Sequence, residues 1–341
     1  MTKAVEFDKV SIVFGENPQS ALPLMDAMKE RPEVQTETGQ VLGVHDCSLT
    51  VATGEILVLM GLSGSGKSTL LRAVNGLNPV VRGAVHVNDG DRMVNVTDAD
   101  AATLRRIRQQ RVAMVFQQFG LLPWRSVREN VGLGLELGGL PKAERNTRVQ
   151  AQLSLVGLSD WADRKVSELS GGMQQRVGLA RAFATEAPIL LMDEPFSALD
   201  PLIRTRLQDE LIDLQNELRR TIIFVSHDLD EAFKLGDRIA IMEGGRIVQC
   251  GTPQDIFSNP ANDYVADFVA HMNPLGVLCA RDVLEPVTGS PKITVAPETD
   301  IREVMEKVGE TGQPVGVIEN GELIGQVTKD KVLAKLLDPR S

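Results

Sequence analysis

The chain has 341 residues, of which 43% are hydrophobic and 24% are charged, a balance typical of a soluble globular protein. Its length exceeds that of one ordinary hydrophobic core and predicts a large and a small domain. The formal net charge of -10 argues against nucleic acid as the main partner and against direct binding to anionic lipid.

The sequence also lacks the signals of a membrane-spanning or exported chain. No stretch approaches the roughly 18 consecutive apolar residues of a transmembrane helix, and the start, MTKAVEFDKV, has no signal-peptide core. We therefore expect a cytoplasmic protein unless a partner holds it at a membrane. Cys47, Cys250 and Cys279 are far apart and form no CxxC pair, which predicts reduced thiols rather than a zinc site or disulfides.

The first part of the chain alternates between strand patterns and an excursion. Residues 3–14 alternate apolar and polar side chains, like an exposed strand, and residues 44–53 resume the alternation. Residues 15–40 between them are richer in Pro, Glu, Thr and Gln and are predicted to be an insertion. Within it, Ser20 is expected to cap a short helix that begins near Pro23.

Apolar runs and helical patterns then alternate as far as residue 270. Strands are predicted at 55–60, at 80–96 with a turn at Asn88-Asp89-Gly90, and at 111–117, 188–192, 221–225, 237–242 and 246–249. Helices are predicted at 67–77, 98–110, 141–165 with a break near Gly157, 171–185, 201–219, 229–234 and 253–269. Strands that alternate with helices indicate an α/β fold around a mainly parallel sheet with both faces covered.

The character of the sequence changes after His271. Residues 291–336 predict a strand (KITVA), a helix over 301–309, a strand (PVGVIE), a turn at Asn320-Gly321, a strand (ELIGQVT) and a helix over 329–337. This unit is compact and separate, so the domain boundary is placed near residues 272–276.

The first motif is a glycine-rich loop between a predicted buried strand and a predicted helix. It reads Gly61, Leu62, Ser63, Gly64, Ser65, Gly66, Lys67, Ser68 and Thr69, and it fits G-x-x-x-x-G-K-[ST]. The glycines let backbone N–H groups curl around phosphates, and the helix N-terminus adds a favourable dipole. Lys67 is expected to reach the β- and γ-phosphates of a nucleotide, and the Ser68 hydroxyl is expected to bind Mg²⁺.

The second motif, ILLMDEP at residues 189–195, ends an apolar strand with two carboxylates. Asp193 falls at the carboxyl end of the strand, where α/β sheets bind ligands, and can hold Mg²⁺ directly or through water. Glu194 beside it can act as the general base on an attacking water. The alternative, a carboxylate pair that merely caps a helix, is disfavoured by the phosphate loop earlier in the chain.

The third motif is a second glycine turn that opens a helix, Leu169-Ser170-Gly171-Gly172-Met173-Gln174-Gln175. Here the chain closely resembles the ABC ATPase family, whose signature is LSGGQ, with the usual glutamine displaced by one position to Gln174. Further motifs follow in the family's order over residues 3–270. Gln117 matches the Q-loop, Ser197-Ala-Leu-Asp200 matches the D-loop, His227 matches the switch histidine, and Phe14 is the best match to the aromatic that stacks on adenine.

The resemblance implies a P-loop ABC ATPase fold over residues 1–271, with a RecA-like core, an antiparallel β subdomain and a helical signature subdomain. It also implies a homodimer of cassettes, in which each MgATP lies between the phosphate loop of one copy and the signature of the other. His227 is then expected to contact the γ-phosphate, and Gln117 to approach Mg²⁺ and sense a membrane partner. The signature residues implied at the nucleotide from the second copy are Ser170, Gly171, Gly172 and Gln174, and Asp200 of the D-loop is also implied at the nucleotide. His45, His86 and His271 match no motif and are read as structural.

A transmembrane permease is implied as the partner that the loop after Gln117 would move. Leu121, Leu122, Pro123 and Trp124 are expected near its docking groove. The alternative, packing of these four side chains within the helical subdomain, stays open.

Several segments resemble the glycine betaine/proline subgroup of ABC importers. They are residues 15–40, DPLIRTRLQDEL and VSHDLDEAFKLGDRIAIMEGGRIVQCGTP, while LLRAVNGLNPV and VFQQFGLLPWRSV look most like a choline-importing branch. This implies uptake of a quaternary ammonium solute, most closely choline, with glycine betaine or proline as the alternative. A solute-binding protein would be an indirect partner. The chain would lie peripherally on the cytoplasmic face of the bacterial inner (plasma) membrane.

Two other classes of function are weaker interpretations. A soluble ABC ATPase that works on ribosomes or DNA usually fuses two cassettes or inserts a long coiled coil, and this acidic chain does neither. A non-hydrolysing regulatory cassette is disfavoured because Glu194 and His227 are both present. The C-terminal residues 276–341 resemble one CBS-type repeat, a small α+β unit expected to regulate the dimer or to stabilise it.

Overall fold

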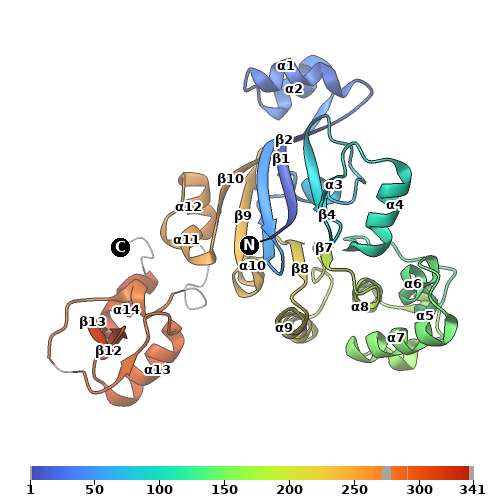
Figure 1. The fold of residues 1–341 in the computed structure, drawn as a ribbon. Helices are drawn as coiled ribbons and strands as arrows, with labels where there is room; N and C mark the ends of the chain where they lie inside the picture. Colours follow the sequence, from blue (N-terminus) through green and yellow to red (C-terminus); the bar gives the residue numbers. More distant parts are fainter. Residues whose placement is uncertain (1, 271–277, 290, 338–341) are drawn as a thin grey trace. The chain divides into compact units, whose positions relative to one another are not determined.

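The structure is a computed structural model that describes residues 2–270, 278–289 and 291–337 (Figure 1). Its contacts divide the chain into two compact units, residues 1–227 with 240–247 and residues 228–239 with 248–341. The boundary predicted near residues 272–276 lies outside the described residues, as does His271. The division into domains 1–271 and 276–341 therefore stays a prediction.

The first sheet is antiparallel, with the strand order β2-β1-β4-β5. Its strands are β1 (Lys3–Phe14), β2 (Val41–Ala52), β4 (Arg82–Asn88) and β5 (Met93–Asn95). The predicted turn after Asn88 is confirmed, because Asn88 pairs with Met93 across it. The prediction of an exposed first strand is wrong. β1 lies between β2 and β4, and its residues 10–13 are all buried, because register shifts beside Val10 interrupt the simple alternation.

The second sheet has the strand order β10-β9-β3-β8-β7-β6. Its strands are β3 (Ile56–Met60), β6 (Val112–Val115), β7 (Ile189–Asp193), β8 (Thr221–Val225), β9 (Arg238–Glu243) and β10 (Arg246–Gly251). β3, β8, β7 and β6 run parallel, and every residue of β3, β7 and β8 is buried. This burial on both faces explains their continuous apolar sequences.

Helices follow most of the parallel strands, as the pattern predicts. They are α3 (Lys67–Ala73), α4 (Ala101–Gln110), α5 (Val127–Val131), α6 (Leu133–Leu137), α7 (Lys142–Leu155), α8 (Gly171–Ala184), α9 (Pro201–Leu218), α10 (Leu229–Leu235), α11 (Pro253–Ser258) and α12 (Asp263–Val269). Helices α5, α6 and α7 gather against α8 and form a helical subdomain (Figure 1). Among the described residues, none of the helices has both the length and the apolar character needed to cross a membrane.

Two predicted helices are divided in the structure. The predicted break near Gly157 is confirmed, because α7 ends at Leu155 and Gly157 has a left-handed backbone with φ of 66°. The single helix predicted over 253–269 is wrong. It is interrupted after Ser258, since Pro260 has no N–H to donate and keeps Asn259 out of the helical region.

Residues 15–40 connect β1 to β2, whose ends pair at Phe14 and Val41. The connection contains a 3₁₀ turn η1 (Pro18–Ala21) and the helices α1 (Leu22–Asp26) and α2 (Arg31–Thr38). The predicted cap is wrong, because Ser20 lies inside η1, where its Oγ donates to the carbonyl of Asn17. Helix α2 was not predicted. It begins after a capping box at Glu30 and ends at Thr38, with Gly39 as its C-cap, and its Val34 is fully buried against β1 and β2.

The C-terminal residues contain the predicted strand–helix–strand–strand–helix order. The elements are β11 (Thr294–Val295), α13 (Ile301–Thr311), β12 (Val315–Glu319), β13 (Glu322–Val327) and α14 (Lys329–Leu337), and the sheet order is β11-β12-β13. The predicted turn at Asn320-Gly321 joins β12 to β13, with φ of 51° and 87° at the two residues. Both values are positive, as a two-residue hairpin turn of this type requires.

Candidate functional site

Four segments far apart in the sequence meet where the parallel strands end. The glycine-rich loop follows β3, Gln117 follows β6, Asp193 ends β7 with Glu194 directly after it, and His227 follows β8. Carboxyl ends of parallel strands lie at one edge of a sheet, which brings these side chains together. A cavity of about 740 Å³ opens there, lined by Phe14, Arg31, Gln35, Val41, Leu42, Gly43, Ser63, Gly64, Gly66, Lys67, Ser68, Thr69, Gln117, Glu194 and His227.

The glycine-rich loop is wrapped tightly around its lysine. Lys67 Nζ donates to the carbonyl oxygens of Gly61 (2.7 Å) and Leu62 (3.0 Å). Burial lowers the pKa of Lys67, while the nearby Glu194 and Asp193 charges oppose that shift. Gly61 has a φ of 139°, and a Cβ there would lie 2.1 Å from the carbonyl oxygen of Met242, so only glycine fits.

Asp193 is a buried carboxylate with two partners on helix α3. Ser68 Oγ donates to its Oδ1 at 2.6 Å, and Arg72 Nη2 pairs with its Oδ2 at 2.8 Å. The pairing satisfies a charge that is fully buried. Arg72 was not predicted, although it stands four positions after Ser68 and so on the same face of α3.

Two predicted residues, Gln117 and His227, converge on the carboxylate of Glu194. Gln117 Nε2 donates to its Oε2 at 3.2 Å, and His227 Nδ1 lies 3.4 Å from the same oxygen. The backbone of Glu194 is left-handed, with φ of 48°, a strained conformation that surrounding contacts must hold. Gln175 Nε2 provides one such contact, donating to the Glu194 carbonyl oxygen at 3.1 Å.

The cavity fits a nucleotide at both of its ends. At the loop, Ser65 Oγ is buried and has no hydrogen-bond partner among the described residues, as expected where a phosphate oxygen binds. The hard oxygens of Ser68 and Asp193 suit Mg²⁺. At the other end, Phe14 is 36% exposed and its ring lies over Gly43, beside Val41. This aromatic and aliphatic end suits the face of a purine base.

The signature residues lie elsewhere in the chain's structure. Ser170 caps α8, where its side chain accepts from Met173 N, and Gln174 Nε2 donates to the Leu169 carbonyl at 3.1 Å. Asp200 caps α9 by accepting from Ile203 N at 3.1 Å. None of Ser170, Gly171, Gly172, Gln174 and Asp200 is among the residues that line the cavity. Gly61, Leu62, Ser65 and Asp193 are likewise not among the lining residues, and Leu62 is 62% exposed.

Two lining residues, Arg31 and Gln35, come from the unpredicted helix α2. Neither the periodicity of residues 15–40 nor any motif within them indicates that they contact the phosphate loop. The excursion is polar on its surface, and only its packing on β1 and β2 brings one face of α2 to the cavity.

Comparisons with known proteins agree with this arrangement. Residues 44–197 match the family model described as ABC transporter. The chain is 44% identical over 338 residues to the "Glycine betaine/proline betaine transport system ATP-binding protein ProV" of Escherichia coli (strain K12), covering 98% of this chain and 83% of that protein. It is 42% identical over 325 residues to the "Glycine betaine/carnitine transport ATP-binding protein GbuA" of Listeria monocytogenes serotype 1/2a (strain 10403S), covering 95% and 80%.

A solved structure gives the same fold. The dimeric ATP-binding cassette MJ0796, in a post-hydrolysis state bound to ADP and Pi, superposes with a TM-score of 0.63. The two sequences are 30% identical, and the match covers 73% of this chain and 98% of that one. The similarity therefore extends over a complete cassette of that protein.

Proposed function

The chain belongs to the ABC transporter family as an ATP-binding subunit, and we propose that two copies of it drive the import of a quaternary ammonium solute, choline before glycine betaine. The chain is an ATP hydrolase that uses ATP and Mg²⁺ and is coupled to transport. One observation carries the proposal for its mechanism. Gln117 and His227 meet at a single oxygen of Glu194, in the cavity that Lys67 and Ser68 also line.

The proposed reaction is attack of a water oxygen on the γ-phosphorus of ATP. Glu194 takes a proton from that water as the new P–O bond forms, and the bond between the γ-phosphorus and the oxygen bridging it to the β-phosphate breaks, which leaves ADP and phosphate. Gln117 and His227, at 3.2 and 3.4 Å from Glu194 Oε2, hold the carboxylate in place. Lys67 stabilises negative charge on the β- and γ-phosphate oxygens.

Three residues are proposed as ligands of Mg²⁺. Ser68 Oγ and Asp193 Oδ1, which lie 2.6 Å apart, would hold the ion together with the amide oxygen of Gln117. When bound, Mg²⁺ neutralises charge on the β- and γ-phosphate oxygens. Arg72 keeps the Asp193 carboxylate oriented from its other oxygen.

A second copy is proposed to complete each site. Ser170, Gly171, Gly172 and Gln174 open helix α8, and a helix N-terminus attracts anions. Within one chain they are separate from the cavity, so a partner cassette would bring them to the γ-phosphate. Large apolar side chains are exposed beside both halves of this proposed interface, Leu62 at 62% and Leu202, next to Asp200, at 80%.

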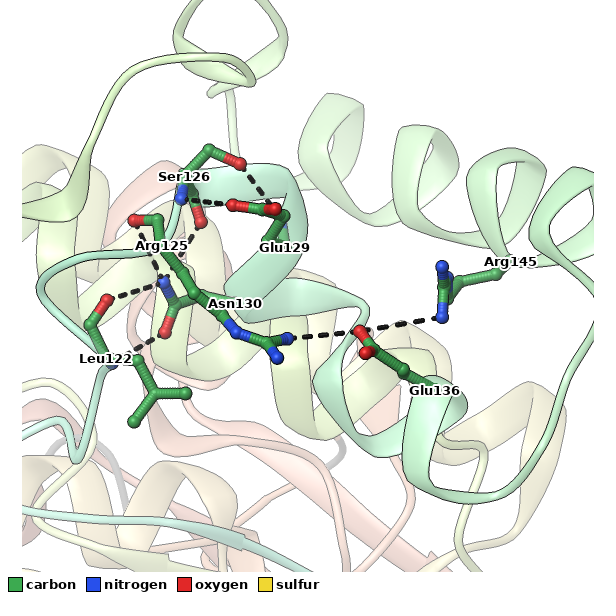
Figure 2. Close-up of polar contacts among 7 residues, drawn as sticks. All are labelled: Leu122, Arg125, Ser126, Glu129, Asn130, Glu136 and Arg145. Carbon is green, nitrogen blue, oxygen red and sulfur yellow. Dashed lines mark hydrogen bonds and ion pairs between the residues drawn. The ribbon is translucent and has the colours of Figure 1, made fainter.

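The loop after Gln117 is proposed to pass movement to the permease. Arg181 of α8 donates to the carbonyls of Gly120 (2.6 Å) and Phe119 (2.7 Å). Further along, the fully buried amide of Asn130 on α5 accepts from Leu122 N at 2.8 Å and donates to carbonyls of the same loop (Figure 2). A shift of Gln117 relative to Glu194 would therefore move α5 and α8 together.

The permease is proposed to dock next to this loop. An apolar groove of about 310 Å³ is lined there by residues that include Leu77, Phe116, Leu133 and Leu137. None of the four expected residues Leu121, Leu122, Pro123 and Trp124 is among its lining residues. Leu122 is held within the subdomain by Asn130, whereas Trp124 is 70% exposed and free to contact a partner at the rim.

The C-terminal residues 276–341 are proposed to be a CBS-like unit that stabilises the dimer. Its strand–helix order supports the resemblance, and the alternative is a sensor of ionic strength or of a ligand. Deletion of 276–341 distinguishes the two. If the ATPase rate of the deleted chain responds to salt as the full chain does, sensing of ionic strength by this unit is excluded.

Reconstituted uptake tests the proposed function. We expect vesicles that contain the chain, its permease and its solute-binding protein to take up labelled choline only when ATP is supplied. We also expect the chain to lie peripherally on the cytoplasmic face of the membrane. Glu194→Gln is the matched control, because it keeps the side-chain shape but cannot accept the proton. Uptake of glycine betaine or proline without choline would establish the alternative solute. Absence of any ATP-dependent uptake would contradict the importer role.

A further inference from the structure

Helix α2 of the insertion places the guanidinium of Arg31 against the phosphate loop. Arg31 Nη1 donates to the carbonyl oxygen of Gly64, inside the loop, and Arg31 Nη2 donates to the carbonyl oxygen of Gly43, on strand β2. One side chain thus ties two segments of the cavity wall to each other. Charge-assisted bonds of this kind are stronger than bonds between neutral groups.

The space around this guanidinium is closely filled. A Cβ on Gly66 would lie 3.3 Å from Arg31 Nη2, and a Cβ on Gly245 would lie 2.8 Å from it. Arg31 Nε is buried and has no hydrogen-bond partner among the described residues. Burial lowers the pKa of Arg31, but an arginine stays charged. A fixed positive charge therefore lies beside the loop that binds the triphosphate.

Helix α2 is itself firmly placed. Its fully buried Val34 packs in a small core with Met25 of α1 and with residues of β1 and β2. The capping box at Glu30 fixes the turn that carries Arg31. Gln35, four positions after Arg31 and so on the same face, also lines the cavity.

We propose that Arg31 is a positioning residue of the ATP site, supplied by the insertion, which braces the phosphate loop in its phosphate-binding shape. The carbonyl of Gly64 shares its peptide unit with the N–H of Ser65, so a guanidinium on that oxygen also polarises an N–H of the loop. In this account residues 15–40 are part of the nucleotide site rather than an appendage. The inference rests on the proposed use of this cavity for MgATP.

The test is the affinity of the full-length chain for MgATP. Binding is measured by displacement of a fluorescent ATP analogue, together with KM and kcat of hydrolysis. We expect Arg31→Met to raise both Kd and KM about tenfold, the effect of losing charge-assisted hydrogen bonds, with little change in kcat at saturating ATP. Arg31→Lys, which keeps the charge but cannot bridge two carbonyls in a fixed fork, should give an intermediate increase.

Two variants on the same insertion serve as controls. Lys29→Met removes a cation that pairs with Glu33 at 2.7 Å and does not line the cavity, so its Kd should stay within about twofold of wild type. Val34→Ala loosens helix α2 without touching the loop. The proposal is overturned if Arg31→Met binds MgATP as wild type does. It is also overturned if Val34→Ala raises Kd as much as Arg31→Met, because the effect is then one of helix packing. Failure of wild type itself to bind MgATP would count against the proposed function instead.

Discussion

At the scale of single residues, Glu194 combines a predictable side chain with an unpredictable backbone. Its place after an apolar strand allowed its position in the cavity to be predicted, since a buried parallel strand ends at the ligand-binding edge. Its left-handed backbone, with φ of 48°, could not be predicted, because a glutamate gives none of the signal that glycine gives for this conformation. The hydrogen bond from Gln175 to the Glu194 carbonyl could not be predicted from the sequence either, since it depends on how α8 packs beside β7.

His45 was predicted to be structural, and it accepts a hydrogen bond that only the neutral imidazole can accept. Its Nδ1 accepts from Arg246 Nη2 at 2.7 Å, which requires a neutral ring nitrogen. Burial, and then the Arg246 charge, lower the pKa of His45 below its ordinary value of 6.5. The folded chain therefore resists a proton that the unfolded chain accepts.

This difference predicts a loss of stability in mild acid. As pH falls below about 6.5, the unfolded state binds more protons than the folded state. The free energy of unfolding therefore decreases as the pH falls. We expect His45→Gln, which keeps an acceptor but does not titrate, to flatten this decrease. Urea unfolding of both proteins at several pH values between about 7.5 and 5 measures it. An equal decrease in the two proteins would contradict the assignment to His45.

At the scale of elements, the strands that end at the site were predictable and the inserted helix α2 was not. Strands β3, β7 and β8 are buried on both faces, as their continuous apolar sequences predict. Helix α2 has one buried residue, Val34, in eight, so it lacks the apolar stripe that marks a helix in a sequence. Its contribution of Arg31 to the cavity could be found only from the folded contacts.

The helix α5 depends on a buried amide that ties it to the preceding loop. Asn130 is fully buried, and Figure 2 shows its side chain facing the backbone of Leu122, Arg125 and Ser126. On the same loop, Arg125 pairs with Glu136 at 3.0 Å. The amide replaces backbone partners that an irregular loop cannot supply for itself.

Asn130→Ala should therefore destabilise the chain by about 1–3 kcal/mol, because it leaves a buried N–H and buried carbonyls without partners. Urea unfolding gives the magnitude. Thr147→Ala is a matched control in the same subdomain, since the exposed Thr147 hydroxyl donates to the Ala143 carbonyl of its own helix; it should change stability by less than about 0.5 kcal/mol. A similarly small change for Asn130→Ala would show that the loop holds its shape without the amide.

At the scale of the whole molecule, the proposed nucleotide site follows from the topology of the sheet. Four parallel strands of one sheet bring the phosphate loop, Gln117, Glu194 and His227 to a single cavity, and the order of the motifs along the chain made this predictable. The signature residues around Ser170 remain outside that cavity within one chain. This is the physical reason for proposing that the active form is a pair of cassettes.

The most direct test of that claim is the molar mass and nucleotide content of the Glu194→Gln protein after gel filtration in MgATP. Without the base, ATP should bind but not be hydrolysed, so the closed pair should accumulate. We predict a species of twice the monomer mass that retains about one ATP per chain, while wild type under the same conditions retains ADP or none. A Glu194→Gln protein that turns over ATP as fast as wild type, or that keeps ATP while remaining a single chain, would contradict the account.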